Sequence, residues 1–122
     1  MALASNLVQI GLNSKEADFL GDTYTGALAA LGTTQGTASP LVSSITRVTT
    51  ATGGINDGVI LPTLIQAKNS VYVVYNVTGA TINIYPGVGD NINELAANTA
   101  ITLTTGNTLL LIAGGTNRWI SK

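Results

Sequence analysis

The sequence contains no cysteine and no histidine, and only 9% of its 122 residues are charged. Without cysteine the chain forms no disulfide and offers no thiolate to a metal. Without histidine it lacks the side chain that most often acts as a general acid or base near neutral pH. An ordinary soluble domain carries about 25% charged residues. The low charge therefore predicts a surface largely covered by partners or by other copies of the chain, and the alternative is a small Thr-rich monomer with an unusual surface.

Long apolar runs and clusters of positive charge are also missing. The longest purely apolar run, LLLIA at 109–113, is far shorter than the ~20 residues that span a bilayer. The first basic residue is Lys15, so the start of the chain does not resemble a secretory signal, and we expect synthesis in the cytoplasm. The five basic residues are scattered among six acids and form no stripe that would attract nucleic acid. We expect neither a membrane nor a nucleic acid as partner.

β-Branched and aromatic residues, by contrast, recur at period two between Gly and Asn turns, which is typical of short strands. The predicted strands are 42–52, 58–62, 71–77, 81–85, 100–104, 108–113 and 118–121. The short connection TGA between 71–77 and 81–85 predicts a hairpin. In the second of these strands Ile82 and Ile84 should point inward, with Tyr85 outward. The pattern predicts one all-β domain, a β-sandwich, jelly roll or barrel of about six to eight short antiparallel strands.

Residues 1–40 differ from residues 41–122 and are predicted to form an N-terminal arm that ends at Pro40. Within this arm NSKEADFLG, at 13–21, has the signature of a short helix, because Asn13 can cap the first turn and Glu16 completes a capping box. The segment TGALAALG, at 25–32, is either a second short helix or a small-residue segment that packs flat against a neighbour. The β-domain is expected to occupy residues 41–122.

The stretch INIYPGVGDNIN, at 82–93, could hold a phosphate, a metal ion or only a turn. A dinucleotide fingerprint fails because Ile92 stands where the third glycine belongs. Asp90, Asn91, Asn93 and Glu94 offer oxygen ligands, but their order does not match a calcium-binding loop. The remaining interpretation is a turn, in which Pro86 and two glycines shape the backbone and Asp90 or Asn91 closes it.

Three further patterns in the sequence could mark a site. Asp57, Asp90 and Glu94 lie on loops and could converge as an acid and base pair, although solvated turn acids are far commoner. Trp119 could form a stacking platform with the tyrosines, but a large aromatic in the last strand more often closes a core. NVT at 76–78 fits the glycan acceptor pattern. We therefore predict no enzyme, and no catalytic, cofactor-binding or metal site.

The segments NDGVILP at 56–62 and VYVVYNVTGATINIYPGVGDNINEL at 71–95, followed by a glycine-linked strand pair ending in RWIS, resemble a domain of small tailed-phage virion proteins. The resemblance covers residues 41–122 and rests on structural turns. It implies a capsid decoration, or cement, protein on the outer capsid surface, commonly trimeric, whose partners are the major capsid protein and its own copies. The arm would contact the capsid or neighbouring subunits. The alternative is a receptor- or carbohydrate-binding virion module of a tail or fibre.

Overall fold

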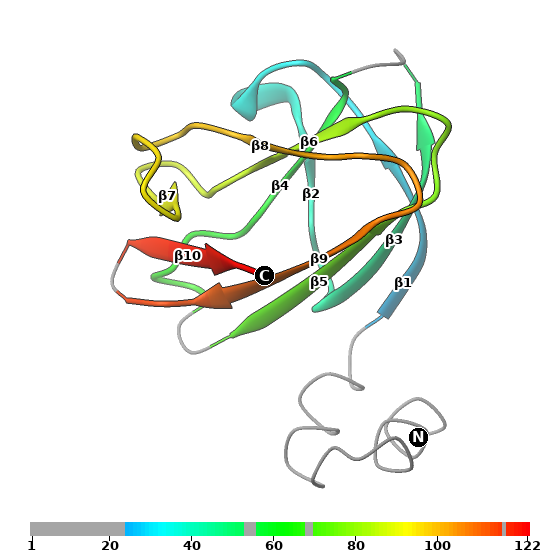
Figure 1. The fold of residues 1–122 in the computed structure, drawn as a ribbon. Coiled ribbons are helices and arrows are strands. Elements are labelled where there is room, and N and C mark those ends of the chain that lie inside the picture. The colour runs from blue at the N-terminus through cyan, green and yellow to red at the C-terminus, as the bar shows by residue number, and fades with distance from the viewer. Residues whose placement is uncertain (1–23, 53–55, 68–69, 116) are drawn as a thin grey trace, which may run out of the picture.

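The computed structural model describes residues 24–52, 56–67, 70–115 and 117–122. These residues form short strands and one 3-10 turn (Figure 1). The elements are β1 (Tyr24–Ala30), η1 (Gln35–Thr37), β2 (Ser39–Pro40), β3 (Ile45–Ala51), β4 (Gly58–Ile60), β5 (Val71–Asn76), β6 (Ile82–Tyr85), β7 (Asn91–Ile92), β8 (Ile101–Leu103), β9 (Thr108–Ala113) and β10 (Arg118–Ser121). The predicted all-β class is confirmed.

The strands form two sheets that face each other across one core. Sheet A has the order β1-β3-β5-β9-β10-β7, and sheet B has the order β2-β4-β6-β8. From β1 to β6 the chain alternates between the sheets, and each new strand lies parallel to the strand one coil earlier. Ile45, for example, is in register with Tyr24 on one side and with Val73 on the other. This part of the chain is therefore a solenoid-like arrangement of three coils.

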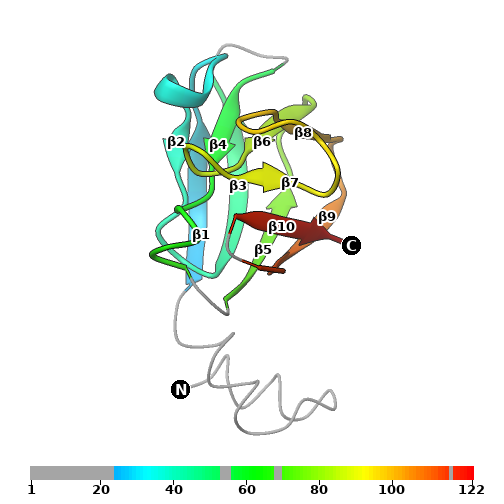
Figure 2. The ribbon, with the colours of Figure 1, turned by 90° about the vertical axis from the view of Figure 1, so that its left-hand side faces the viewer.

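The C-terminal strands cover one end of the stack of coils, and the two that pair with the last coil run antiparallel to it. β8 pairs antiparallel with β6 in sheet B, and β9 pairs antiparallel with β5 in sheet A. β10 then returns antiparallel to β9, and β7 lies beside it as the last strand of sheet A. Figure 2 views the molecule from this side, with β7 and β10 towards the viewer. The predicted antiparallel arrangement is thus corrected: the strands form solenoid-like coils of parallel strands that end in antiparallel ones, and not a clear sandwich or barrel.

Several finer predictions are also corrected. Strands 71–77 and 81–85 do not form a hairpin, because β5 belongs to sheet A and β6 to sheet B. Residues 25–32 are not helical, since β1 covers most of them. Residues 24–40, predicted to belong to the arm, instead supply β1 to sheet A and β2 to sheet B, with η1 between them. The helix predicted at 13–21 lies outside the described residues.

The core is built from the side chains that point between the two sheets. Sheet A contributes Val48, Val74, Leu111 and Trp119, each fully buried. Sheet B contributes Val59, Ile82, Ile84 and Leu103, which lie in the same hydrophobic cluster. Burial of this kind stabilises a fold by roughly 25 cal/mol for each Å² of apolar surface removed from water. The inward direction predicted for Ile82 and Ile84, and the core position predicted for Trp119, are confirmed.

Tyr85 was expected to point outward but is only 8% exposed. Its ring packs over Gly58, where an added Cβ would approach Cε2 of the ring to 2.7 Å. Its hydroxyl donates to the carbonyl of Thr33 at 2.9 Å. Glycine opposite the ring therefore makes room for it, and this side chain ties β6 to the chain that follows β1.

A buried amide, Asn76, explains why the turn after β5 leads into the other sheet. Its Nδ2 donates to the carbonyls of Ala80 at 2.9 Å and Leu103 at 2.8 Å, and its Oδ1 accepts from the backbone N–H of Thr78 at 2.9 Å. Such local side-chain bonds compete with regular strand pairing. Asn76 has no exposed surface, so the glycan acceptor pattern at 76–78 is closed to modification in the folded chain.

Candidate interaction surface

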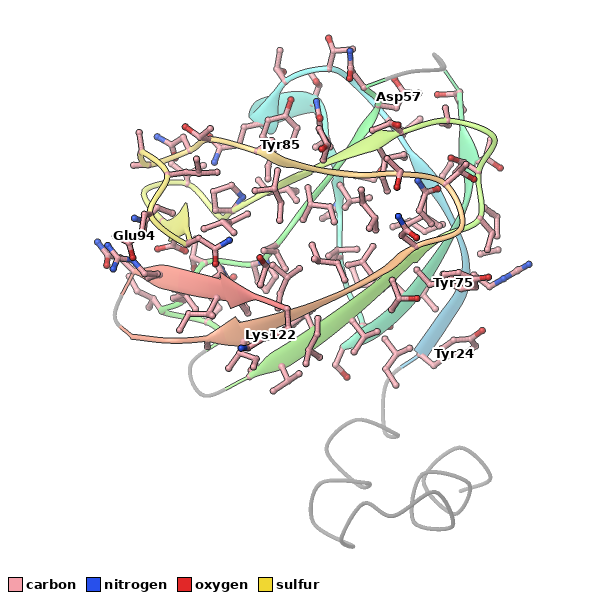
Figure 3. The ribbon with its side chains drawn as sticks, viewed as in Figure 1. Tyr24, Asp57, Tyr75, Tyr85, Glu94 and Lys122 are labelled. Atoms are coloured by element: carbon pink, nitrogen blue, oxygen red, sulfur yellow. The ribbon has the colours of Figure 1, made fainter. Side chains whose placement is uncertain are left out.

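The three carboxylates that could serve as an acid and base pair have separate partners. Asp57 is buried and accepts a hydrogen bond from Oγ1 of Thr52 at 3.3 Å. Asp90 is buried and accepts from the backbone N–H of Leu64 at 2.8 Å. Glu94 is exposed and meets Arg118 at 3.3 Å. Figure 3 shows Asp57 and Glu94 at opposite ends of the molecule, so these two do not form a pair.

The stretch that carries Asp90 is a turn in the structure. The backbone N–H of Asp90 donates to the carbonyl of Gly87 at 2.9 Å, while the carboxylate of Asp90 reaches across to the chain at Leu64. Gly87 lies against the backbone of Thr63, where an added Cβ would come within 2.6 Å of Cα. Asn98 then accepts from the backbone N–H of Gly89 at 2.8 Å. These contacts hold residues 86–98, here called the 86–98 loop, in one arrangement.

Metal ligands are not gathered in the part of the chain that the structure describes. No group of three or more Asp or Glu residues there could hold an ion. Within the same residues no helix has the length and apolar character needed to cross a membrane. The side chains that stand out on the described surface are apolar instead.

Trp119 belongs to the core and forms no exposed platform. It has no exposed surface and meets the ring of Tyr72 edge to face, with 5.6 Å between the ring centroids. Burial raises the pKa of Tyr72 above its ordinary value of 10.0, because the charged phenolate loses its hydration. The two rings pack on the inner face of sheet A, towards sheet B.

The outer face of sheet A, which points away from sheet B, is the most unusual surface of the molecule. Residues paired directly across a sheet share one face, so the register identifies its members. One row runs through Tyr24, Ile45, Val73 and Leu110, and a second through Val71, Ile112 and Ile120. We call these seven residues, together with Tyr75, the outer apolar face.

None of these eight side chains is buried. Tyr24 is 54% exposed, Ile120 40% and Tyr75 39%. Figure 3 shows Tyr24 and Tyr75 on the same side of the molecule, both pointing away from the core. Monomeric soluble proteins rarely expose a contiguous apolar patch of more than a few hundred Å². A face of this composition is typical of an interaction site.

Most charged side chains beside this face are basic. Arg47 is in register with Tyr75, and its guanidinium donates to the carbonyl of Gly26 at 3.3 Å. Lys122 lies beside Leu110 through backbone hydrogen bonds in both directions. On β10 Arg118, two residues before Ile120 and so on the same face, pairs with Glu94 at 3.3 Å. The outer apolar face therefore carries positive charge at its margins.

This surface could not be located from the sequence alone, because the sequence does not show which strands lie side by side. One signal was present: β9, TLLLIA, is apolar at successive positions, which indicates a strand with apolar surroundings on both faces. Leu109 and Leu111 point into the core, whereas Leu110 and Ile112 belong to the outer apolar face.

Comparison of the chain with known protein families, with curated proteins and with solved structures finds no match.

Proposed function

We propose that this protein is a structural component of a phage virion that binds the outer capsid surface as an oligomer and stabilises the junctions between major capsid subunits. The proposal assigns it no catalytic role and no cofactor. The resemblance of residues 41–122 to small virion proteins supports the phage setting, and the 9% content of charged residues supports a molecule that works while covered by partners.

The observation that carries the proposal is the outer apolar face. Its residues lie on β1, β3, β5, β9 and β10, which are held together by backbone hydrogen bonding in one sheet. The face is therefore formed before any partner arrives, and docking on it needs little reordering of the backbone. A rigid apolar surface repeated over many copies gives a shell many weak contacts that add up, as multivalent binding requires.

The direct test is co-sedimentation of the full-length protein with capsid shells that lack it. We expect saturable binding at a fixed ratio to the major capsid protein, and no binding to shells already occupied. Val73→Thr, on the outer apolar face, should weaken binding, whereas Thr102→Ser on β8 should leave it unchanged. Absence of binding at saturating protein would refute the decoration role.

A second candidate is a receptor- or carbohydrate-binding virion module, which the two exposed tyrosines favour. Tyr24 and Tyr75 lie on one side of the molecule, and aromatic rings are common contacts for sugars and partner proteins. This candidate predicts that a carbohydrate array binds the full-length protein, and that Tyr24→Ala and Tyr75→Ala each abolish the signal. It also predicts no binding to capsid shells, so the two experiments separate the candidates.

A further inference from the structure

The outer apolar face and its margins carry a net positive charge. Arg47, Arg118 and Lys122 supply three positive charges, and Glu94, paired with Arg118 at 3.3 Å, supplies one negative charge, which leaves +2. Two copies that met through this face would each bring that net charge, and like charges brought together across an interface disfavour association. The face therefore favours an apolar occupant with a net negative charge.

The segment 1–23 of the same chain has both properties. It contains the largely apolar stretch LVQIGL at 7–12 and the pair FL at 19–20. Its charged side chains are three acids, Glu16, Asp18 and Asp22, and one base, Lys15, which leaves −2. The segment thus matches the outer apolar face in apolar character and opposes it in charge.

The segment joins the described chain at the face itself. Tyr24, the first described residue, belongs to the outer apolar face and is in register with Ile45, which is in register with Val73 on the next strand. Figure 3 shows Tyr24 at the point where the described chain begins, with its side chain pointing away from the core. The residues that precede Tyr24 are therefore attached at the edge of the surface that needs an occupant.

The segment is also long enough to cross the face. Five strands at a spacing of ~4.8 Å span about 19 Å, and the six residue steps from the row of Arg118 to the row of Arg47 span about 20 Å. A chain of 23 residues reaches ~35 Å as a continuous helix and farther when it is extended. In either conformation residues 1–23 can reach the far margin of the face.

Attachment gives this segment an advantage over a separate molecule. A separate partner loses translational and rotational freedom when it binds, and a standard interface buries about 800 Å² on each side. A segment attached beside its binding surface has an effective concentration in the millimolar range. Contacts too weak to hold a free partner therefore suffice to hold residues 1–23.

We propose that residues 1–23 pack on the outer apolar face of their own copy while the protein is free, and that docking on a partner displaces them. The apolar residues of the segment cover the rows through Ile45 and Val73, and its acids lie towards the basic margin. This inference rests on the proposed function, to which it adds the regulation of the docking face. The displaced segment is then available for the contacts that the resemblance implies for the arm.

The test uses the absence of cysteine from the chain, which allows a nitroxide to be attached at one introduced cysteine in the full-length protein. Two labelled proteins are prepared without capsids, Ser5→Cys and Ser14→Cys. A nitroxide broadens the NMR resonances of nuclei close to it. We expect at least one label to broaden the backbone amides of Val71 and Ile112, which lie two and three strands away from β1. The amide of Thr102 on sheet B is the internal control and should be unaffected.

Mixing experiments separate contact within one copy from contact between copies. Labelled protein without isotope enrichment is mixed with unlabelled protein enriched in ¹⁵N, and we expect no broadening in the mixture. Broadening there would assign the segment to a neighbouring copy and overturn the proposal. It would also be overturned if both labels left Val71 and Ile112 unbroadened in the singly labelled proteins.

Charge variants test the match between segment and face. Glu16→Gln, Asp18→Asn and Asp22→Asn combined should lower the covered population by roughly threefold or more, as expected for the loss of three exposed charge contacts. Lys15→Gln is the matched control and should leave the cover unchanged or strengthen it. The amide spectrum of each variant shows whether it is folded. Broadening that survives the triple neutralisation unchanged would overturn the charge match on which the proposal stands.

The triple variant also separates this inference from the proposed function. In co-sedimentation it should bind capsid shells more tightly than wild type, because a larger fraction of the protein has its face uncovered. A protein whose labels broaden the face but which binds no shell would refute the decoration role alone. A protein that binds shells while the labels leave the face unbroadened would refute this inference alone.

Discussion

The inner and outer faces of sheet A carry similar side chains in very different surroundings. Along β9, Leu109 and Leu111 contribute to the core, whereas their neighbours Leu110 and Ile112 lie on the outer apolar face. Along β10, Trp119 has no exposed surface and Ile120 is 40% exposed. The inner face is covered by sheet B. The outer face has a similar apolar character without such a cover among the described strands, and this difference is the reason to propose a partner for it.

The test with the largest expected effect on stability replaces one residue on each face of β10. Trp119→Ala should lower the free energy of unfolding by about 3–5 kcal/mol, because it leaves a large cavity in the core. Ile120→Ala should cost about 1 kcal/mol or less but should weaken binding to capsid shells. Urea unfolding followed by far-UV circular dichroism, at concentrations where the protein is dissociated, measures the first quantity. Similar losses of stability for the two variants would mean that the outer face is buried as firmly as the core.

A second pair lies on β5, where Asn76 points inward and Tyr75 outward. Asn76→Ala should cost about 3 kcal/mol, because the carbonyl of Leu103 loses the amide donor and the backbone N–H of Thr78 loses its acceptor, and unpaired buried groups are expensive. Tyr75→Ala should change stability by about 1 kcal/mol or less. Hydrogen exchange at the backbone N–H of Gly106, which donates to the carbonyl of Asn76, should accelerate in the first variant. Unchanged exchange there would contradict the organising role of Asn76.

The smallest expected effect concerns pH and the inner face alone. Burial raises the pKa of Tyr72 above 10.0, so the folded state holds this proton more tightly than the unfolded state. The resulting stabilisation is fully present below pH 10 and is lost as the pH rises through the pKa of the folded state. Urea midpoints between about pH 8.5 and 11 should therefore fall less steeply in Tyr72→Phe than in wild type. Tyr75→Phe on the outer face is the matched control, and an equal change in its slope would argue against burial as the cause.

Strand positions could be read from the sequence, whereas strand partners could not. Each of the seven predicted strands overlaps an observed one, because period-two alternation reflects burial on one face. The partner of a parallel strand lies a whole coil away, and nothing in the sequence near a strand records which one it is. The TGA connection shows the difficulty. Its glycine allows a tight turn, but the bonds of Asn76 make it a corner between two sheets.

The sequence did not predict the first strand, β1, for a related reason. β1, YTGALAA, is rich in small residues whose local preference does not favour a strand. Its conformation comes from pairing along β3, where Tyr24 meets Ile45 and Ala30 meets Ala51. Tertiary pairing decided the structure of this segment, and local sequence could not.

The position of the candidate surface could not be predicted from the sequence. The low charge predicted a covered exterior, yet locating it required the order of strands in sheet A, which brings Ile45, Val73 and Leu110 into one row. The turn predicted after Pro86 agrees with the geometry, because the residues that shape a turn are neighbours in the sequence. The carboxylate of Asp90, however, accepts from the backbone N–H of Leu64. Leu64 is distant in the sequence, so this partner could not be predicted.

The stacking of coils has a consequence for how this protein can change over time. Within β1 to β6 each coil offers the next one the same two rows of backbone donors and acceptors. A duplicated coil could therefore be inserted between existing ones, lengthening the molecule by about 4.8 Å, while the antiparallel strands that close the end keep their contacts. Gene duplication could therefore change the length of the stack by one coil at a time. Molecules with different numbers of coils would span gaps of different size.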